Sequence, residues 1–273
     1  MLETVSRQPI GNLLREWRTR RRLSQFDLAF EADISTRHLS FMETGRSTPS
    51  REMLLRLSEP LEIPLRERNV LLMAAGYAPV FPERPLDDPA LDAAHKAVGL
   101  VLTGHEPYPA LAIDRRWNLV AANRALAPLL EGIDAELLRP PVNVLRLSLH
   151  PEGLAPKIAN FGEWRAHLFL RLRQQIHATA DPFLEELMRE LNDYPAPPGE
   201  DAPAEPEYGG VVVPLRLITK AGVLSFFSTT TIFGTPVDIT LSELAVESLF
   251  PADTDTAEKL REMFAEYLAS QAE

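Results

Sequence analysis

The chain has 273 residues, a length that allows one or two domains. Its hydrophobic fraction of 45% and its charged fraction of 25% are those of a globular protein, and they exclude collagen, global disorder and a disulfide-stapled miniprotein. The chain contains no cysteine, which excludes disulfides, thiolate catalysis and cysteine-based zinc sites.

The net charge of −11 hides a difference between the two ends of the chain. Residues 1–78 carry 12 Arg and no Lys against 10 acidic residues, a net charge of +2, while the remaining 16 basic and 29 acidic residues give −13. We therefore expect only the N-terminal segment to approach a polyanion. Its basic residues cluster at Arg15, Arg18, Arg20, Arg21 and Arg22. A cluster of this kind is also compatible with a solvated helix face.

The N-terminal residues give no sign of export. Residues 1–9 hold no apolar run that could form the core of a signal peptide. A run of about 18 apolar residues, the length of a membrane span, occurs nowhere in the sequence. We therefore predict a cytoplasmic protein without a membrane partner.

Residues 10–78 have the periodicity of short helices. Serines stand at three N-cap positions, Ser24, Ser35 and Ser50, and Gly45 supplies a left-handed C-terminal cap. The spacing predicts about five helices. Four prolines within residues 79–95 then exclude a regular helix or central strand. We therefore predict an all-α domain over 1–78, a proline-rich linker over 79–95 and a second domain over 96–273.

The second domain has a mixed pattern that predicts an α+β fold. Its clearest helix covers residues 160–178, where apolar residues recur three or four apart. A second acidic, proline-rich stretch at 195–207 is predicted to be a loop. The candidate strands lie near 110–121, 211–219, 223–233 and 236–241.

Residues 24–45, SQFDLAFEADISTRHLSFMETG, predict a helix, a tight turn and a second helix, which is the helix-turn-helix layout. On the second helix, Leu39 and Met42 share the inner face. Arg37, Ser40, Phe41 and Thr44 fall on the outer face. Arginine can bind guanine edges with two hydrogen bonds, serine can contact several base edges, and an outward phenyl ring can meet a thymine methyl or a partner surface. The alternative is a helical hairpin that serves packing alone.

Residues 10–76 resemble the XRE-type (lambda-repressor-like) helix-turn-helix regulators, and the resemblance is carried by the string RRLSQFDLAFEADISTRHLSFMETGRSTPSREMLLRLSEPLEIP at 21–64. In that family the third helix enters the major groove of DNA. The resemblance therefore implies a duplex DNA partner and assigns DNA-binding roles to Gln25, Thr36, Arg37 and Ser40, with Arg46 as a phosphate contact. Phe41 joins this DNA-binding set because of its place on the outer face of the helix. The family's turn has glycine where this chain has Asp33, a residue type that tolerates the left-handed conformation better than most.

The segment after the linker resembles the MmyB-like regulators, whose ligand-binding domain has a PAS-like fold. Three strings carry the resemblance: PALAIDRRWNLVAANRAL at 109–126, NFGEWRAHLFLRLRQQ at 160–175 and LSFFSTTTIFGTPVDITLSELAVESLFPAD at 224–253. The resemblance implies that this domain binds a small, fatty-acid-like ligand, with no other cofactor.

Apolar residues of the second domain could line such a ligand cavity: Trp117, Trp164, Leu168, Leu172, Phe226 and Phe227. A plain core would use the same residues. Arg165 lies beside Trp164, where its guanidinium could hold a carboxylate head group or make a surface salt bridge. Asn123 is a weaker candidate, because asparagine often serves as a cap or as a structural hydrogen-bond partner.

No enzyme motif or paired-histidine zinc motif occurs, so we predict neither a catalytic residue nor a metal site. The sequence predicts a DNA-binding transcriptional regulator that acts as a homodimer and senses a small ligand through its second domain. The alternative is a constitutive DNA-binding protein whose second domain only dimerises or recruits a partner.

Overall fold

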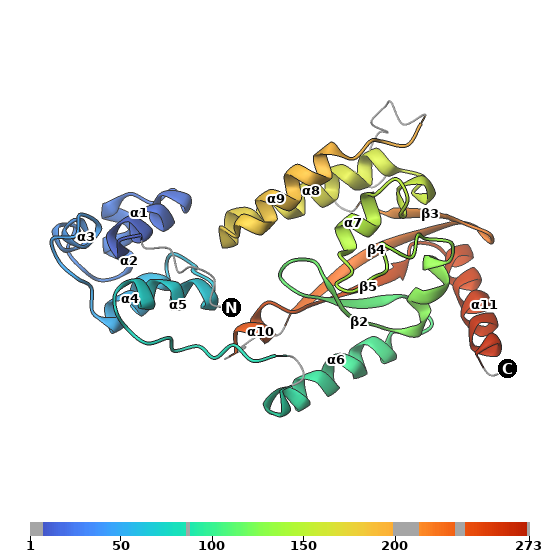
Figure 1. Ribbon diagram of the computed structural model, residues 1–273, viewed down its shortest axis with the longest axis horizontal. Helices are drawn as coiled ribbons and strands as arrows, with labels where there is room; N and C mark the ends of the chain where they lie inside the picture. The colour runs from blue at the N-terminus through green and yellow to red at the C-terminus, as the bar shows by residue number, and fades with distance from the viewer. Residues whose placement is uncertain (1–7, 86–87, 199–212, 233–237, 272–273) are drawn as a thin grey trace. The chain divides into compact units, whose positions relative to one another are not determined.

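The structure, a computed structural model, describes residues 8–85, 88–198, 213–232 and 238–271 (Figure 1). The chain divides into two compact units, the first made mainly of residues up to Glu83 and the second mainly of residues from Arg84 onward. Helix α6 (Asp92–Gly104) occupies the end of the range expected as a linker, 79–95. The domain limits expected from the sequence stay a prediction.

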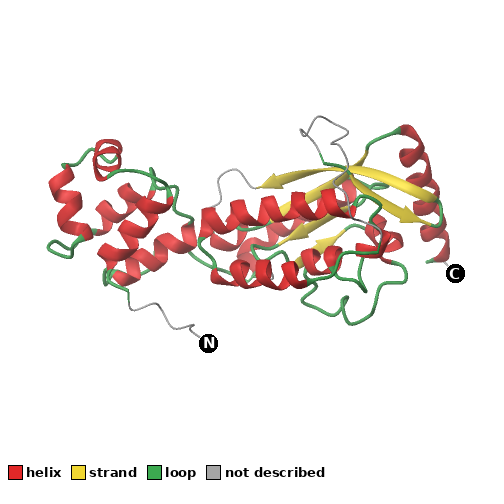
Figure 2. Cartoon of the chain, turned by 90° about the horizontal axis from the view of Figure 1, so that it is seen from above, coloured by secondary structure: helices red, strands yellow, loops and turns green. Residues whose placement is uncertain are grey.

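In its described residues the first unit consists of helices alone (Figure 2). The helices are α1 (Ile10–Arg20), α2 (Gln25–Glu31), α3 (Thr36–Glu43), α4 (Arg51–Ser58) and α5 (Leu65–Ala74). Each of the three expected serine caps is present: the hydroxyls of Ser24, Ser35 and Ser50 accept backbone N–H bonds from the first turns of α2, α3 and α4. Gly45 has φ of +73° just after α3, as its capping role requires.

The core of the first unit consists mainly of leucines, with Trp17, Met42 and Ile63 among them. A close contact between α1 and α3 depends on Gly11. A Cβ at this position would lie 2.5 Å from the carbonyl oxygen of Met42 and 2.7 Å from that of Glu43. In the turn between α2 and α3, Asp33 adopts φ of +52°, the left-handed conformation expected there.

The second unit is built on a five-stranded antiparallel sheet with strand order β2-β1-β5-β4-β3. The strands are β1 (Ala110–Ile113), β2 (Leu119–Ala122), β3 (Leu215–Thr219), β4 (Gly222–Ile232) and β5 (Ala245–Pro251). The predicted fold class, an all-α helix-turn-helix unit followed by an α+β PAS-like domain, is confirmed.

Helices cover both faces of this sheet (Figure 1). On one face, Val98 and Leu102 of α6 pack with Ala110, Ala112 and Val246. On the other face lies α8 (Phe161–Thr179), whose Arg171 bonds to Glu247 on the central strand. Helix α7 (Val144–Leu149) contacts α9 (Pro182–Asp193), and α11 (Thr254–Ser270) packs on β4 and β5. Shorter helices are η1 (Pro89–Leu91), η2 (Arg124–Leu130), η3 (Ala155–Lys157) and α10 (Ile239–Ser242).

Two strand assignments from the sequence need correction. The prediction of a strand over 236–241 is wrong for the described residues, because Ile239–Ser242 form the helix α10. Residues 236–237 lie outside the described residues. Six residues with alternating apolar side chains are too few to separate a strand from a helical turn. The strand missed by the sequence is β5, whose residues 246–249 are all buried. Burial on both faces removes the alternation that predicts a strand.

Other expected elements agree with the structure in part. Strands β3 and β4 lie within or next to the expected ranges 211–219 and 223–233, of which residues 211–212 and 233 lie outside the described residues. The expected segment 110–121 forms two strands with a turn between them. The loop expected at 195–207 lies outside the described residues beyond position 198.

Candidate functional site

Helix α3 presents the outer face that the sequence predicts. Leu39 and Met42 are fully buried on its inner side. Thr36 and Arg37 are exposed at its N-terminal end, and Ser40 is half-buried one turn later. The three expected base-reading side chains therefore lie together on one accessible surface of the helix.

Phe41 and Arg46 extend this outer surface to the end of α3 and just beyond it. Phe41 is half-buried and Arg46 is exposed. Among the described residues, neither Arg37 nor Arg46 forms a salt bridge with a carboxylate, so both charges are available to an anion. We refer to Thr36, Arg37, Ser40, Phe41 and Arg46 as the α3 outer surface.

A buried carboxylate holds the base of the α3 outer surface in place. The side chain of Glu43, at the end of α3, is 0% exposed. Its oxygens accept two bonds from Arg18 of α1, at 2.6 and 3.0 Å, and one of 2.8 Å from the amide of Gln25 at the start of α2. The side chain of Arg15 lies 3.6 Å away. One carboxylate therefore ties α3 to both preceding helices.

The electrostatics of this cluster favour a charged Glu43. Burial alone raises the pKa of the Glu43 carboxyl, but hydrogen bonds from Arg18 and Gln25 and the charges of Arg18 and Arg15 outweigh it, so the pKa lies below the ordinary 4.5. Gln25 was expected to belong to the DNA-binding set. In this structure it is half-buried, and its amide donates to Glu43.

In the second unit, several residues expected to line a ligand cavity gather between α8 and the sheet. Trp164, Leu168 and Leu172 are buried on the inner side of α8, and Phe226 is fully buried on β4. Trp117, in the turn after β1, lies with its ring 4.9 Å from the Arg171 guanidinium.

Arg171 is the arginine of α8 that faces the sheet, where its guanidinium pairs with the buried Glu247 and also donates to Thr230. His167, one turn earlier, stacks on Trp164. Burial, helped by the charge of Arg171, lowers the pKa of His167 from its ordinary 6.5. The apolar layer between α8 and the sheet therefore also contains the polar side chains of Arg171, Glu247 and His167.

The remaining expected ligand residues lie elsewhere. Arg165 donates to the carbonyl oxygens of Leu191 and Asn192 at the end of α9, at 3.2 and 3.0 Å. The buried side chain of Asn123 bonds to three backbone groups between α6 and β1. Phe227, 36% exposed, stacks on Phe250, on the sheet face opposite to that of Phe226. The expected ligand residues thus do not surround a single cavity.

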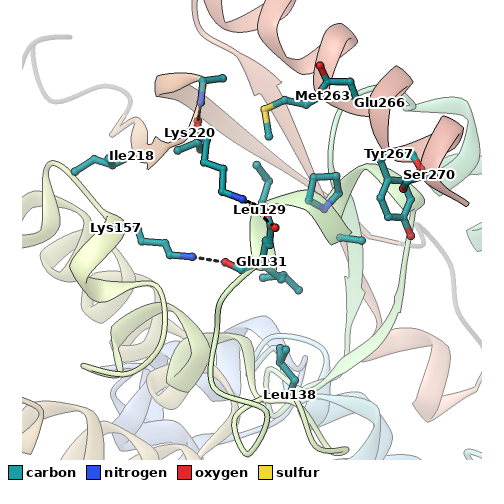
Figure 3. A pocket seen from close by; sticks show the side chains of 15 residues that line it. Leu129, Glu131, Leu138, Lys157, Ile218, Lys220, Met263, Glu266, Tyr267 and Ser270 are labelled. Carbon is teal, nitrogen blue, oxygen red and sulfur yellow. Dashed lines mark hydrogen bonds and ion pairs between the residues drawn. The ribbon is translucent and has the colours of Figure 1, made fainter.

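A pocket of about 1090 Å³ opens between η2, the turn joining β3 to β4, and α11 (Figure 3). Its apolar walls include Leu129, Leu138, Ile218 and Met263. The amine of Lys220 bonds to both carboxylate oxygens of Glu131 at 3.0 Å, and the amine of Lys157 bonds to the Glu131 carbonyl at 2.5 Å. We call this the η2–α11 pocket; Glu266, Tyr267 and Ser270 of α11 complete its polar edge. An apolar body with a few convergent polar groups is the usual composition of a small-molecule site.

Sequence reasoning missed the residues of this pocket and the role of Glu43. Lys157 and Lys220 are 63 positions apart in the chain, and a single sequence carries no sign that they meet. For Glu43 the sequence does contain a signal of burial. It lies four residues after Leu39 and next to Met42, which is the spacing of the inner face of α3. Among the described residues, no group of three acidic or imidazole side chains could hold a metal, and no helix could cross a membrane.

The first unit has a capped helix-turn-helix with a basic outer surface, and the second has a sheet and a pocket. This combination is typical of a DNA-binding protein joined to a ligand-binding domain. Comparison with protein families identifies both parts. The MmyB-like transcription regulator ligand binding domain matches residues 94–263, and a helix-turn-helix family matches residues 14–68. The chain belongs to the MmyB-like transcription regulators.

Comparison with curated proteins found no match. Among solved structures, the chain is 14% identical to an RNA-binding light-oxygen-voltage receptor, with a TM-score of 0.24. The alignment covers 96% of this chain and 63% of the receptor chain, so this chain spans less than two thirds of the receptor's length.

Proposed function

We propose that the α3 outer surface enters the major groove of DNA and reads its sequence, with Arg37 at a base edge and Arg46 on a phosphate. The observation that carries this proposal is the exposure of Arg37 on α3 and of Arg46 just after its end, on the side opposite to the fully buried Leu39 and Met42. The N-terminal residues of a recognition helix commonly meet base edges, and arginine is the commonest partner of guanine.

Substitution of the two arginines separates base reading from phosphate contact. Arg37→Ala should cost about 1–3 kcal/mol at one base pair and relax the preference there. Arg46→Ala should weaken binding to all duplexes similarly and flatten the salt dependence, because a phosphate contact carries no sequence information. The measurement is a titration of the full chain against a duplex selected from a random pool and against its single-base variants.

The control for these variants is Arg139→Ala, an exposed arginine of the second unit paired with Glu136. It should leave the affinity for DNA unchanged. An equal loss on every duplex for Arg37→Ala would remove this residue from the base readers and leave it as a phosphate contact.

We propose that the second domain senses a small fatty-acid-like molecule in the η2–α11 pocket. The support is the combination of apolar walls with the amines of Lys157 and Lys220. An aliphatic chain can pack against the apolar walls, and a carboxylate can bond to the amines. The space between α8 and the sheet is the competing location, but the guanidinium in that space, Arg171, is paired with the buried Glu247. Arg165 and Asn123 lie outside it and bond to backbone groups.

Binding of dodecanoate tests this location. Ala127→Trp should place an indole ring at the wall of the pocket and lower the affinity for dodecanoate. The Lys157→Ala/Lys220→Ala pair should lower affinity about three- to tenfold, a modest loss because the Lys220 side chain is 88% exposed. Arg165→Ala is the matched control and should bind as the wild type does. Loss of binding in Arg165→Ala, with normal binding by the lysine pair, would place the ligand beside α8 instead.

We propose that the regulator acts in the cytoplasm as a homodimer, with the ligand favouring one arrangement of the dimer. A ligand can do so only by binding one arrangement better than the other. A symmetric dimer would place its two recognition helices on half-sites separated by about 10–10.5 base pairs or a multiple of that distance. A footprint on the selected duplex tests the spacing.

A further inference from the structure

The ring of Phe41 lies under two cationic side chains of the α3 outer surface. The guanidinium carbon of Arg37 is 5.3 Å from the centroid of the ring, and that of Arg46 is 5.8 Å from it. Both distances fall within the range in which a cation is attracted to the face of an aromatic ring. One phenyl group therefore contacts both of the arginines assigned above to DNA.

The local backbone explains why the three side chains meet. Arg37 and Phe41 are four residues apart on α3 and share one face of the helix. Arg46 returns to the same ring because the chain reverses at Gly45, with the N–H of Arg46 bonded to the carbonyl of Phe41 at 2.8 Å and that of Gly45 to the carbonyl of Met42 at 3.1 Å. These two bonds form a Schellman motif, in which a side-chain contact commonly joins the same two positions.

The two positive charges beside Phe41 indicate that its ring does more than complete the C-terminal cap of α3. Two arginines beside one ring repel each other, and among the described residues no carboxylate forms a salt bridge with either. The ring attracts both, which limits the freedom of two long side chains before any anion arrives. Restricting side chains in their bound arrangement raises affinity because less entropy is lost on binding.

We infer that Phe41 is a positioning residue of the DNA interface: its ring holds Arg37 and Arg46 as a preformed pair, and it acts through them rather than by touching a base. The inference rests on the proposed DNA-binding role of the α3 outer surface. It replaces the thymine-methyl contact expected for this ring from the sequence.

The test compares ring-free and ring-retaining variants on two duplexes, a mixed-sequence 40-base-pair duplex and one selected from a random pool. Phe41→Leu should lower the affinity of the full chain about three- to tenfold on both duplexes, and Phe41→Tyr should stay within about twofold of the wild type. Circular dichroism and thermal melting of each variant check that the helical unit remains folded.

A mutant cycle separates positioning from direct contact. In an Arg37→Ala/Arg46→Ala background at low ionic strength, Phe41→Leu should have no further effect, because the ring then has no cation to hold. The same loss in both backgrounds, or an equal loss for Phe41→Tyr and Phe41→Leu, would overturn the inference and favour a direct contact with DNA. A wild-type chain that enriches no duplex from the pool and does not bind the mixed-sequence duplex would overturn the proposed DNA-binding function as well, so the two failures are distinguishable.

Discussion

Glu43→Gln is expected to destabilise the helical unit by about 3–5 kcal/mol, because it leaves the partly buried Arg18 guanidinium without its counter-charge. The Glu43 side chain is fully buried, and the hydrogen bonds that it accepts from Arg18 and Gln25 join α1 and α2 to the end of α3. The variant should also weaken DNA binding, since the position of α3 depends on the same bonds.

The stabilisation by Glu43 should depend on pH with a definite sign. Its native pKa lies below the ordinary 4.5, so the contribution is fully present above about pH 4.5 and is lost as the pH falls through the native value. The difference in stability between wild type and Glu43→Gln should therefore shrink in acid. Hydrogen exchange of amides in α1–α3 of the full chain, measured between pH 3 and pH 7, reports both the size and the trend.

A matched control for this substitution is Glu59→Gln. Glu59 also accepts a bond from an arginine, Arg68, at 2.5 Å, but its side chain is 71% exposed. An exposed pair contributes about 0–1 kcal/mol, so this variant should change stability little. Equal losses for the two variants would mean that burial does not govern the strength of the Glu43 cluster.

The helical unit could be predicted from the sequence because its signals are local. Serine caps, a glycine past the end of a helix, and apolar side chains three or four residues apart each act within one or two turns. The partners of Glu43 could not be predicted, since Arg18 and Gln25 lie 25 and 18 residues away and meet it only when the helices pack.

The second unit shows where sequence reasoning stops. Helix α8 is amphipathic and was predicted nearly to its ends, but the charged residue that turns toward the sheet is Arg171, not Arg165. Which arginine faces the sheet depends on the position of Glu247 on β5. This strand could not be predicted from the sequence, because it is buried on both faces. Phe226 and Phe227 were grouped as cavity residues although neighbouring strand positions point to opposite faces.

Gly11→Ala is expected to destabilise the helical unit by about 3 kcal/mol, although alanine is the better helix former. The added Cβ would lie 2.5 and 2.7 Å from the carbonyl oxygens of Met42 and Glu43, which are backbone atoms at the end of α3. A change of side-chain rotamer cannot relieve such a contact, so α1 and α3 must move apart. That movement would stretch the bonds between Arg18 and Glu43 and displace the α3 outer surface.

Gly99→Ala supplies the comparison within the same chain. Gly99 lies inside α6, and a Cβ there would meet nothing within 4 Å. This variant should therefore stabilise its helix by about 0.5–1 kcal/mol, the intrinsic difference between alanine and glycine. Hydrogen exchange of α1–α3 and of α6 measures the two effects separately. Helix propensity favours alanine at both positions, so opposite signs would isolate the helix contact at Gly11. Stabilisation by both substitutions would show that α1 and α3 are not closely packed.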